Sequence, residues 1–181
     1  MTFDQSFKVD EVTSLSLPEV IADRVTSAGT FEDGLFSMLD ETLSNAVLSS
    51  WRWLLGQDAV ALVTSALGDL FFWSEKHKAV YFLEVQRGKS TFVDKDVGFF
   101  LDHFLIKDGV LESVLHREFF KSLTGRLGKL KYGECYIAEP WLRLGGSGDV
   151  NTYTKGDLAV YTNLVGQAVE QAMRLERSRV R

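Results

Sequence analysis

Residues 59–93, AVALVTSALGDLFFWSEKHKAVYFLEVQRGKSTFV, carry the pattern that decides the fold. Short apolar runs alternate with polar turns, and the runs are rich in the β-branched and aromatic residues that strands favour. Gly68-Asp69 and Gly88 mark turns, because glycine accepts a positive φ freely. The predicted strands are Ala59–Thr64, Leu70–Trp73, Ala79–Val85 and Ser90–Val93. The stretch therefore predicts a hairpin or meander.

Helical periodicity lies on both sides of this strand-rich stretch. Apolar residues three and four positions apart, with glycine stops, predict helices at 16–29, 40–55, 95–105 and 108–123, and a last one from about Lys155 with Thr154 as its N-cap. Residues 1–14 are interpreted as a polar lead-in. Trp51 and Trp53 point to different faces of their helix, so one is expected in the core and the other partly exposed.

The order of helix, strands and helices is not the alternation of a βαβ protein. It predicts an α+β fold, a mostly antiparallel sheet flanked by helices, built as one compact unit of two subdomains. The boundary is expected near residue 95, which gives an N-terminal subdomain over 14–95 and a helical C-terminal subdomain over 96–181 that ends in a long helix.

The charge of the chain is unevenly distributed. The 181 residues carry a formal net charge of −5, but residues 1–60 alone contain ten acidic and three basic residues. This asymmetry argues against direct binding of nucleic acid by the first third of the chain. It favours a basic partner, because complementary charge steers association. A solvated acidic face without a partner explains the same pattern, and the sequence leaves both interpretations open.

Several classes of protein find no support in the sequence. Cys135 is a single cysteine, which fits a reducing compartment, and its apolar neighbours indicate a small buried residue. The first residues lack the pattern of a signal peptide, and no apolar run is long enough to cross a membrane. We therefore expect a cytoplasmic protein that makes no membrane contact.

The sequence offers no catalytic constellation. His77, His103 and His116 stand apart from one another and from Cys135, so no metal-ligand spacing is present. The Gly145–Gly148 run is followed by an acidic residue where a phosphate loop needs lysine, so it is interpreted as a connecting loop. We therefore expect no enzyme activity, no metal and no cofactor.

Four sequence motifs, taken in their order along the chain, resemble those of a known protein family. They are GTFEDGLF (29–36), ALGDLFFW (66–73), LGKLKYGECY (127–136) and PWLRLGG (140–146). Together they resemble the bacterial GAD-like proteins, which include type VI secretion immunity proteins against DNase effectors. The resemblance covers about residues 17–165, and it assigns the GAD-like part to the N-terminal subdomain. The IAEPW segment (137–141) and the basic C-terminal tail depart from the family pattern, which leaves the identity of the toxin open.

This resemblance implies an immunity protein that binds and neutralises a cognate secreted toxin, which we expect to be a nuclease. The cleft of a DNase must hold phosphate, and an acid-rich surface is able to mimic it. Acidic side chains and a bulky aromatic segment are the candidate contacts. The predicted partner-binding residues are Glu32, Asp33, Asp40, Glu41, Glu139, Trp141 and Arg143. Two alternatives remain: a general intracellular binding or regulatory module unrelated to toxins, and a hydrolase or nuclease in its own right.

Overall fold

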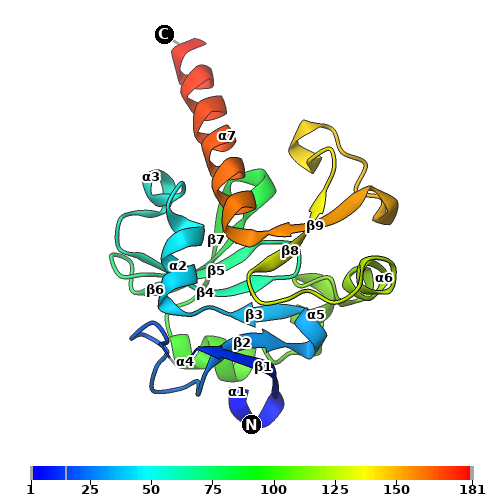
Figure 1. The fold of residues 1–181 in the computed structure, drawn as a ribbon. Coiled ribbons are helices and arrows are strands. Elements are labelled where there is room, and N and C mark those ends of the chain that lie inside the picture. Colours follow the sequence, from blue (N-terminus) through cyan, green and yellow to red (C-terminus); the bar gives the residue numbers. More distant parts are fainter. Residues whose placement is uncertain (1, 15, 180–181) are drawn as a thin grey trace.

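The structure, a computed structural model, describes residues 2–14 and 16–179. Within these residues the centre is a seven-stranded antiparallel sheet whose strands pair in chain order (Figure 1). The strands are β1 Val9–Ser14, β2 Ala28–Phe31, β3 Phe36–Met38, β4 Ala59–Ser65, β5 Leu70–Ser74, β6 Ala79–Glu84 and β7 Lys89–Asp94. Such a meander needs only local connections, and the structure confirms the α+β class predicted from the sequence.

Both faces of the sheet are covered, which gives two hydrophobic cores. Successive side chains of a strand point to opposite faces. In β5, Leu70 and Phe72 accordingly belong to one core and Phe71 belongs to the other. Strand β4 is buried along nearly its whole length for the same reason.

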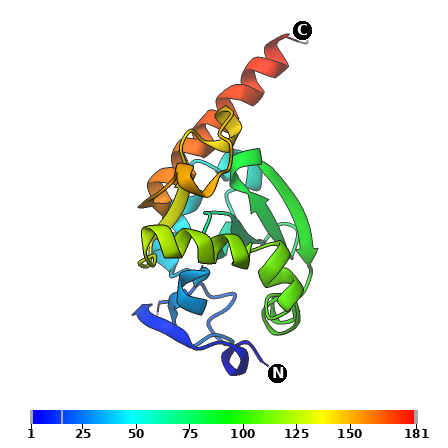
Figure 2. The same cartoon turned by 90° about the vertical axis from the view of Figure 1, so that its right-hand side faces the viewer.

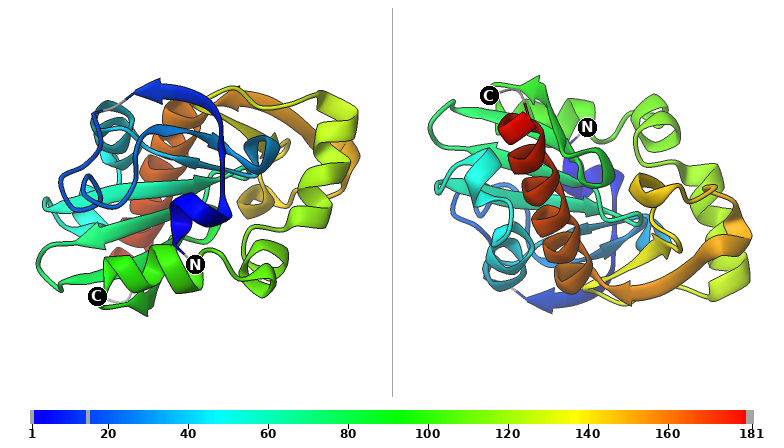
Figure 3. Two further views of the ribbon diagram at one scale, coloured as in Figure 1. Left: turned by 90° about the horizontal axis from the view of Figure 1, so that it is seen from below. Right: turned by 90° about the horizontal axis from the view of Figure 1, so that it is seen from above.

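One face is covered by the helices α2 (Glu41–Leu48), α3 (Arg52–Leu55) and α7 (Leu158–Arg179). Figure 3 shows α7 crossing this face, and Figure 1 shows its C-terminal turns extending away from the body of the molecule. Trp51, which is fully buried between α2 and α3, donates a hydrogen bond from Nε1 to the carbonyl oxygen of Thr162 over 2.9 Å. This bond ties α7 to the segment between α2 and α3.

The other face is covered by shorter elements. They are α1 (Phe3–Ser6), α4 (Val97–Phe99) with the π-helical segment η3 (Phe100–Phe104), α5 (Asp108–Ser113) and α6 (Arg117–Leu127). Phe3 of α1 packs against Phe7, Phe31 and Phe36 with ring centroids 5.2–6.2 Å apart. Figure 2 shows α6 running across this side of the molecule, with the green strands β6 and β7 beyond it.

A second, two-stranded antiparallel sheet joins α6 to α7. It consists of β8 (Glu134–Ala138) and β9 (Tyr153–Asp157). Three 3₁₀ turns lie in the loops near the sheets, namely η2 (Val85–Arg87), η4 (Leu142–Leu144) and η5 (Val150–Thr152), and a fourth, η1 (Glu32–Gly34), joins β2 to β3. Among the described residues, no helix is long and apolar enough to cross a membrane.

The strands predicted from residues 59–93 are confirmed as β4 to β7. The prediction for the two tryptophans is also confirmed, since Trp51 is buried and Trp53 is partly exposed. Cys135 is buried as expected, and burial raises the pKa of its thiol. The division into subdomains at 14–95 and 96–181 stays a prediction; its residues 15 and 180–181 lie outside the described residues.

Two predictions for the N-terminal segment were wrong. The supposed polar lead-in contains the edge strand β1, whose side chains are mostly exposed and therefore show no apolar alternation. The supposed helix over 16–29 is a series of turns. In these turns the Ile21 N–H donates to the carbonyl oxygen of Pro18, and the Arg24 N–H donates to the carbonyl oxygen of Ile21. Ile21 and Val25 are buried, so their spacing reflects contact with the core rather than a helix.

Three predicted helices have different bounds. The helix at 40–55 is divided into α2 and α3, and the helix at 108–123 is divided into α5 and α6 by His116, whose φ of 55° is left-handed. Helix α6 continues through Gly125 and ends at Gly128. The last helix begins at Leu158, because Thr154 belongs to β9 and the Asp157 carboxylate instead accepts a hydrogen bond from the N–H of Val160.

Candidate partner-binding site

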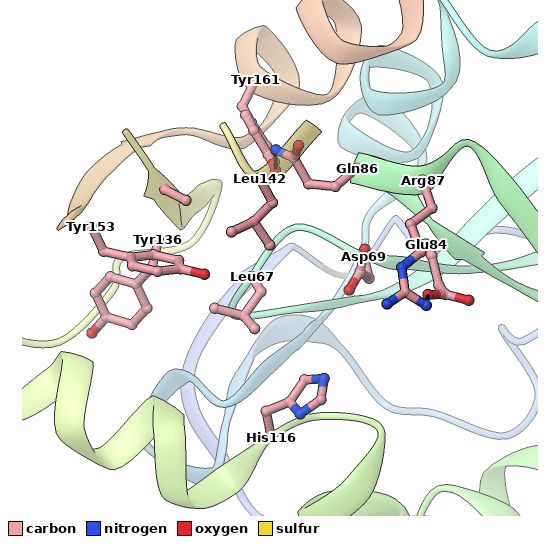
Figure 4. Close-up of a pocket in the computed structure, with 11 residues that line it drawn as sticks. Leu67, Asp69, Glu84, Gln86, Arg87, His116, Tyr136, Leu142, Tyr153 and Tyr161 are labelled. Atoms are coloured by element: carbon pink, nitrogen blue, oxygen red, sulfur yellow. Dashed lines mark hydrogen bonds and ion pairs between the residues drawn. The ribbon is translucent and has the colours of Figure 1, made fainter. Parts of the chain in front are cut away.

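Two adjoining cavities lie between the end of the main sheet and the start of α6. Their volumes are about 480 Å³ and about 150 Å³. Asp69, Glu84, Arg87 and His116 line both of them. Figure 4 shows these four side chains around the smaller cavity, with Asp69 between Leu67 and the Glu84–Arg87 pair. We call the two cavities together the Asp69 groove.

Two hydrogen bonds fix Asp69, one made by its backbone N–H and one made by its side-chain carboxyl. It lies in the turn between β4 and β5, where its N–H donates to Ser65 Oγ over 3.1 Å. The Val85 N–H donates to Asp69 Oδ1 over 2.8 Å, which links the turn to the end of β6. The preceding Gly68 has a φ of +85°, and a Cβ there would lie 2.7 Å from the ring of Tyr161. Close packing therefore requires glycine before this aspartate.

The carboxyl of Asp69 is unusual in its electrostatic surroundings. Burial raises its pKa to about 7, against the smaller opposing effect of the hydrogen bond from Val85. The nearest cation, Arg87, is already paired, because its Nη1 lies 2.9 Å from Glu84 Oε2. Within the described residues no hydrogen bond reaches Asp69 Oδ2. The groove thus contains a carboxyl group without a matching cation.

The wall of the larger cavity is aromatic. Phe71, Phe82, Phe92 and Phe104 line it together with short aliphatic side chains. Phe71 and Phe82 are in contact with ring centroids 4.7 Å apart. Phe92 of β7 borders the cavity, but its ring packs on Tyr81, its cross-strand neighbour on the opposite face of the sheet from Phe82, with ring centroids 5.9 Å apart. The groove therefore combines an open apolar wall with a polar base.

His116 closes one side of the groove from a strained backbone position. Its φ of 55° and ψ of 48° lie in the left-handed region, which residues other than glycine adopt rarely. Such strain often accompanies functional positions. His116 precedes α6, and its side chain is exposed and directed towards the groove (Figure 4).

A third cavity, of about 520 Å³, lies beside the turn between β2 and β3. Glu32 and Asp33 line it, both exposed and both with left-handed φ values of 54° and 59°. Asp33 Oδ1 lies 2.5 Å from Lys129 Nζ. Arg117, which follows His116 of the Asp69 groove, lines this cavity too. The two sites are therefore both bordered by the start of α6.

The structure does not bring the predicted acidic residues together. Asp40 and Glu41 follow β3, at the opposite end of this strand from Glu32 and Asp33. Asp40 is half-buried and caps α2, since its Oδ1 accepts a hydrogen bond from the N–H of Leu43 over 2.7 Å. Glu41 is exposed in the first turn of that helix.

The other three predicted contacts lie in one loop after β8. Glu139 is exposed and accepts a hydrogen bond from Thr154 Oγ1 over 3.2 Å. Trp141 is partly buried against Tyr161, with ring centroids 6.2 Å apart. Arg143 is exposed, and its N–H donates to Gln86 Oε1 over 3.2 Å. Gln86 also lines the smaller cavity, so this loop borders the Asp69 groove.

Sequence reasoning missed the groove itself. The Gly68-Asp69 pair was interpreted only as a turn signal, and His116 only as a histidine without metal-ligand spacing. Asp69, Glu84 and His116 are separated along the chain and meet only because β4 to β6 and α6 converge. In the described part of the chain, no group of three or more metal-ligating side chains is present.

Comparison with known proteins finds a family that matches part of the chain. Over residues 94–177 the chain matches the family described as "T6SS immunity protein Tdi1, C-terminal". This stretch, less than half of the chain, is therefore similar to the C-terminal part of a type VI secretion immunity protein. The match confirms that part of the resemblance seen in the sequence, and it covers α4 to α7.

The fold is shared with a solved structure. It is described as "Crystal structure of Atu4351 from Agrobacterium tumefaciens", with a TM-score of 0.68 and 18% sequence identity over 91% of this chain and 86% of that chain. At this identity the likeness shows the fold alone. No curated protein gives a significant match to the chain.

Proposed function

We propose that this protein is an immunity protein that neutralises a cognate type VI effector, a DNase, and that it does so in the cytoplasm by binding the toxin. The observation that carries the proposal is the match of residues 94–177 to an immunity protein family. Immunity requires recognition of one effector, and recognition of a nuclease is favoured by negative charge, because the nuclease must attract phosphate.

The distribution of charge in the structure supports a basic partner. Of the ten acidic side chains in residues 1–60, eight are exposed, namely Asp4, Asp10, Glu11, Glu19, Asp23, Glu32, Asp33 and Glu41. Four of them, Asp10, Glu11, Glu32 and Asp33, lie in β1 and in the turn between β2 and β3, at the end of the sheet drawn in blue in Figure 1. The other four lie in α1, in the turns before β2 and in α2. A basic cleft approaching this end meets an excess of carboxylates.

The loop over 139–146 supplies the second part of the proposed interface. Leu142 and Leu144 of η4 are 44% and 68% exposed, on either side of Arg143. Exposed apolar side chains next to arginine and tryptophan are typical of the centre of a protein interface. We therefore keep Glu139, Trp141 and Arg143 as proposed contacts, and assign Asp40 a capping role in addition to its proposed contact.

Charge reversal at the predicted acidic residues tests this interface. The toxin domain of the proposed cognate effector is purified, and its association with wild-type protein and with the Glu32→Lys/Glu41→Lys variant is measured at two salt concentrations. We expect the variant to associate at least about tenfold more slowly at low salt, and the difference to shrink at high salt, because exposed charges act mainly on the association rate.

Glu75→Lys/Glu176→Lys is the matched control. It reverses two exposed carboxylates, one in the turn between β5 and β6 and one on the projecting end of α7. If both double variants slow association equally, net charge rather than the proposed residues determines recognition. If neither double variant slows association, the acidic surface has no part in recognition of the toxin. Unfolding curves recorded for each variant separate loss of binding from loss of fold.

A further inference from the structure

The Asp69 groove has the features of a receptor for a single long cationic side chain. It has an apolar wall, a polar base and an opening to solvent. The aliphatic part of a lysine or arginine packs well against apolar surface while its head group reaches a polar partner. Phe82 and Val93 provide such a surface, because both pack against the same core, and Asp69 and Glu84 line the same cavity.

The charges in the groove favour a cation over an anion. Arg87 neutralises Glu84 at 2.9 Å, so Asp69 is left without a cation of its own. The remaining titratable or charged groups that line the two cavities are Glu84, Arg87, His116, Tyr136, Tyr153 and Tyr161. An incoming ammonium or guanidinium group would complete the hydrogen bonding of Asp69 Oδ2, whereas an incoming anion would face two carboxyl groups.

We propose that the Asp69 groove receives a lysine or arginine side chain of the effector, with its stem on Phe82 and Val93 and its head group on Asp69. This inference rests on the proposed function and deepens it, since residues that hold DNA phosphates in a nuclease are lysines and arginines. A cationic anchor in a half-buried pocket is also a common source of affinity in protein interfaces.

The pH dependence of binding provides a direct test. With a pKa of about 7, the Asp69 carboxyl of the free protein is ionised to only about 10% at pH 6 and about 90% at pH 8. A cation binds the ionised form, so the Kd for the purified toxin domain should fall by roughly tenfold between pH 6 and pH 8 through this group. In Asp69→Asn, the side-chain oxygen still accepts the hydrogen bond from the Val85 N–H, but the side chain has no negative charge to attract a cation.

Isothermal titration with the toxin domain at pH 6, 7 and 8 therefore distinguishes the outcomes. We expect Asp69→Asn to weaken binding at pH 8 by at least about tenfold and to remove roughly one decade of the pH dependence seen in the wild type. Val93→Ala, at a half-buried position in the wall of the cavity, should also weaken binding, and its melting curve is recorded to show that the variant is folded. Glu176→Gln is the control for loss of one carboxylate elsewhere.

Failure of the inference and failure of the proposed function are separable. If the wild-type protein does not bind the toxin domain, the proposed function fails. If it binds, and Asp69→Asn and Val93→Ala bind as tightly as the wild type at pH 8 with an unchanged pH profile, the toxin is recognised elsewhere and the groove proposal is overturned.

Discussion

Replacement of Asp69 by asparagine should stabilise the protein, and the gain should depend on pH. In the folded protein the pKa of Asp69 is about 7, whereas its ordinary value is 3.8. Below about pH 4 the carboxyl is protonated in both states, so it has no effect on stability. Between pH 4 and pH 7 the unfolded chain releases the proton and the folded protein keeps it, so the free energy of unfolding falls as pH rises. Above about pH 7 the full penalty is present.

The size of this penalty follows from the pKa difference. Roughly three pKa units at 1.36 kcal/mol each correspond to about 4 kcal/mol. Asp69 lines a groove that water enters, and solvent screening reduces the charge penalty, so we expect about 2 kcal/mol. Asparagine avoids the penalty while its side-chain oxygen still accepts the hydrogen bond of the Val85 N–H.

Urea denaturation of both proteins from pH 4 to pH 8 measures the effect. The free energy of unfolding of Asp69→Asn should exceed that of the wild type by about 2 kcal/mol at pH 8, and the two should converge towards pH 4. Parallel pH profiles of the two proteins would refute the reasoning, since they would place the Asp69 carboxyl in a well-solvated or charge-compensated environment. Proteins retain destabilising groups where function requires them. A carboxylate that lowers stability and lies in a groove therefore fits a binding role.

Three further substitutions test the packing and the caps. Trp51→Ala should lower the free energy of unfolding by about 3–5 kcal/mol in urea denaturation, because it empties a fully buried site and removes the hydrogen bond to Thr162. Gly29→Ala should loosen β1 from β2, since the new Cβ would lie 2.1 Å from the carbonyl oxygen of Glu11; faster amide exchange in β1 is the expected sign, and unchanged exchange would contradict the pairing. Asp40→Ala should cost about 1 kcal/mol through loss of the α2 N-cap, seen as a lower midpoint of thermal unfolding, whereas Asp40→Asn should retain most of it.

The parts of the fold that were predicted correctly are those with a local signal. Strands β4 to β7 are bounded by polar turns and contain the apolar runs that form both cores. Strand β1 has exposed side chains and is held by backbone pairing, so its residues carry no apolar pattern. Helix boundaries at His116 and Asp157 depend on backbone conformations and caps that short-range propensity does not determine.

The candidate site was predictable only in part. Glu32, Asp33 and the loop with Trp141 were singled out from charge and bulk, and whether they contact the toxin stays a prediction. The Asp69 groove depends on contacts between the β4–β5 turn, the end of β6 and the start of α6, which lie far apart in the sequence. Only the folded arrangement shows that Asp69 lacks a cation.

The central claim is that this protein neutralises a DNase effector by binding it. The most direct measurement is degradation of plasmid DNA by the purified toxin domain as wild-type protein is added in increasing ratio. We predict that degradation stops as the protein reaches equimolar amounts, and that a complex with both chains elutes as one species in gel filtration. Undiminished degradation in the presence of excess folded protein, or a toxin domain that forms the complex but has no activity on DNA, would contradict the claim.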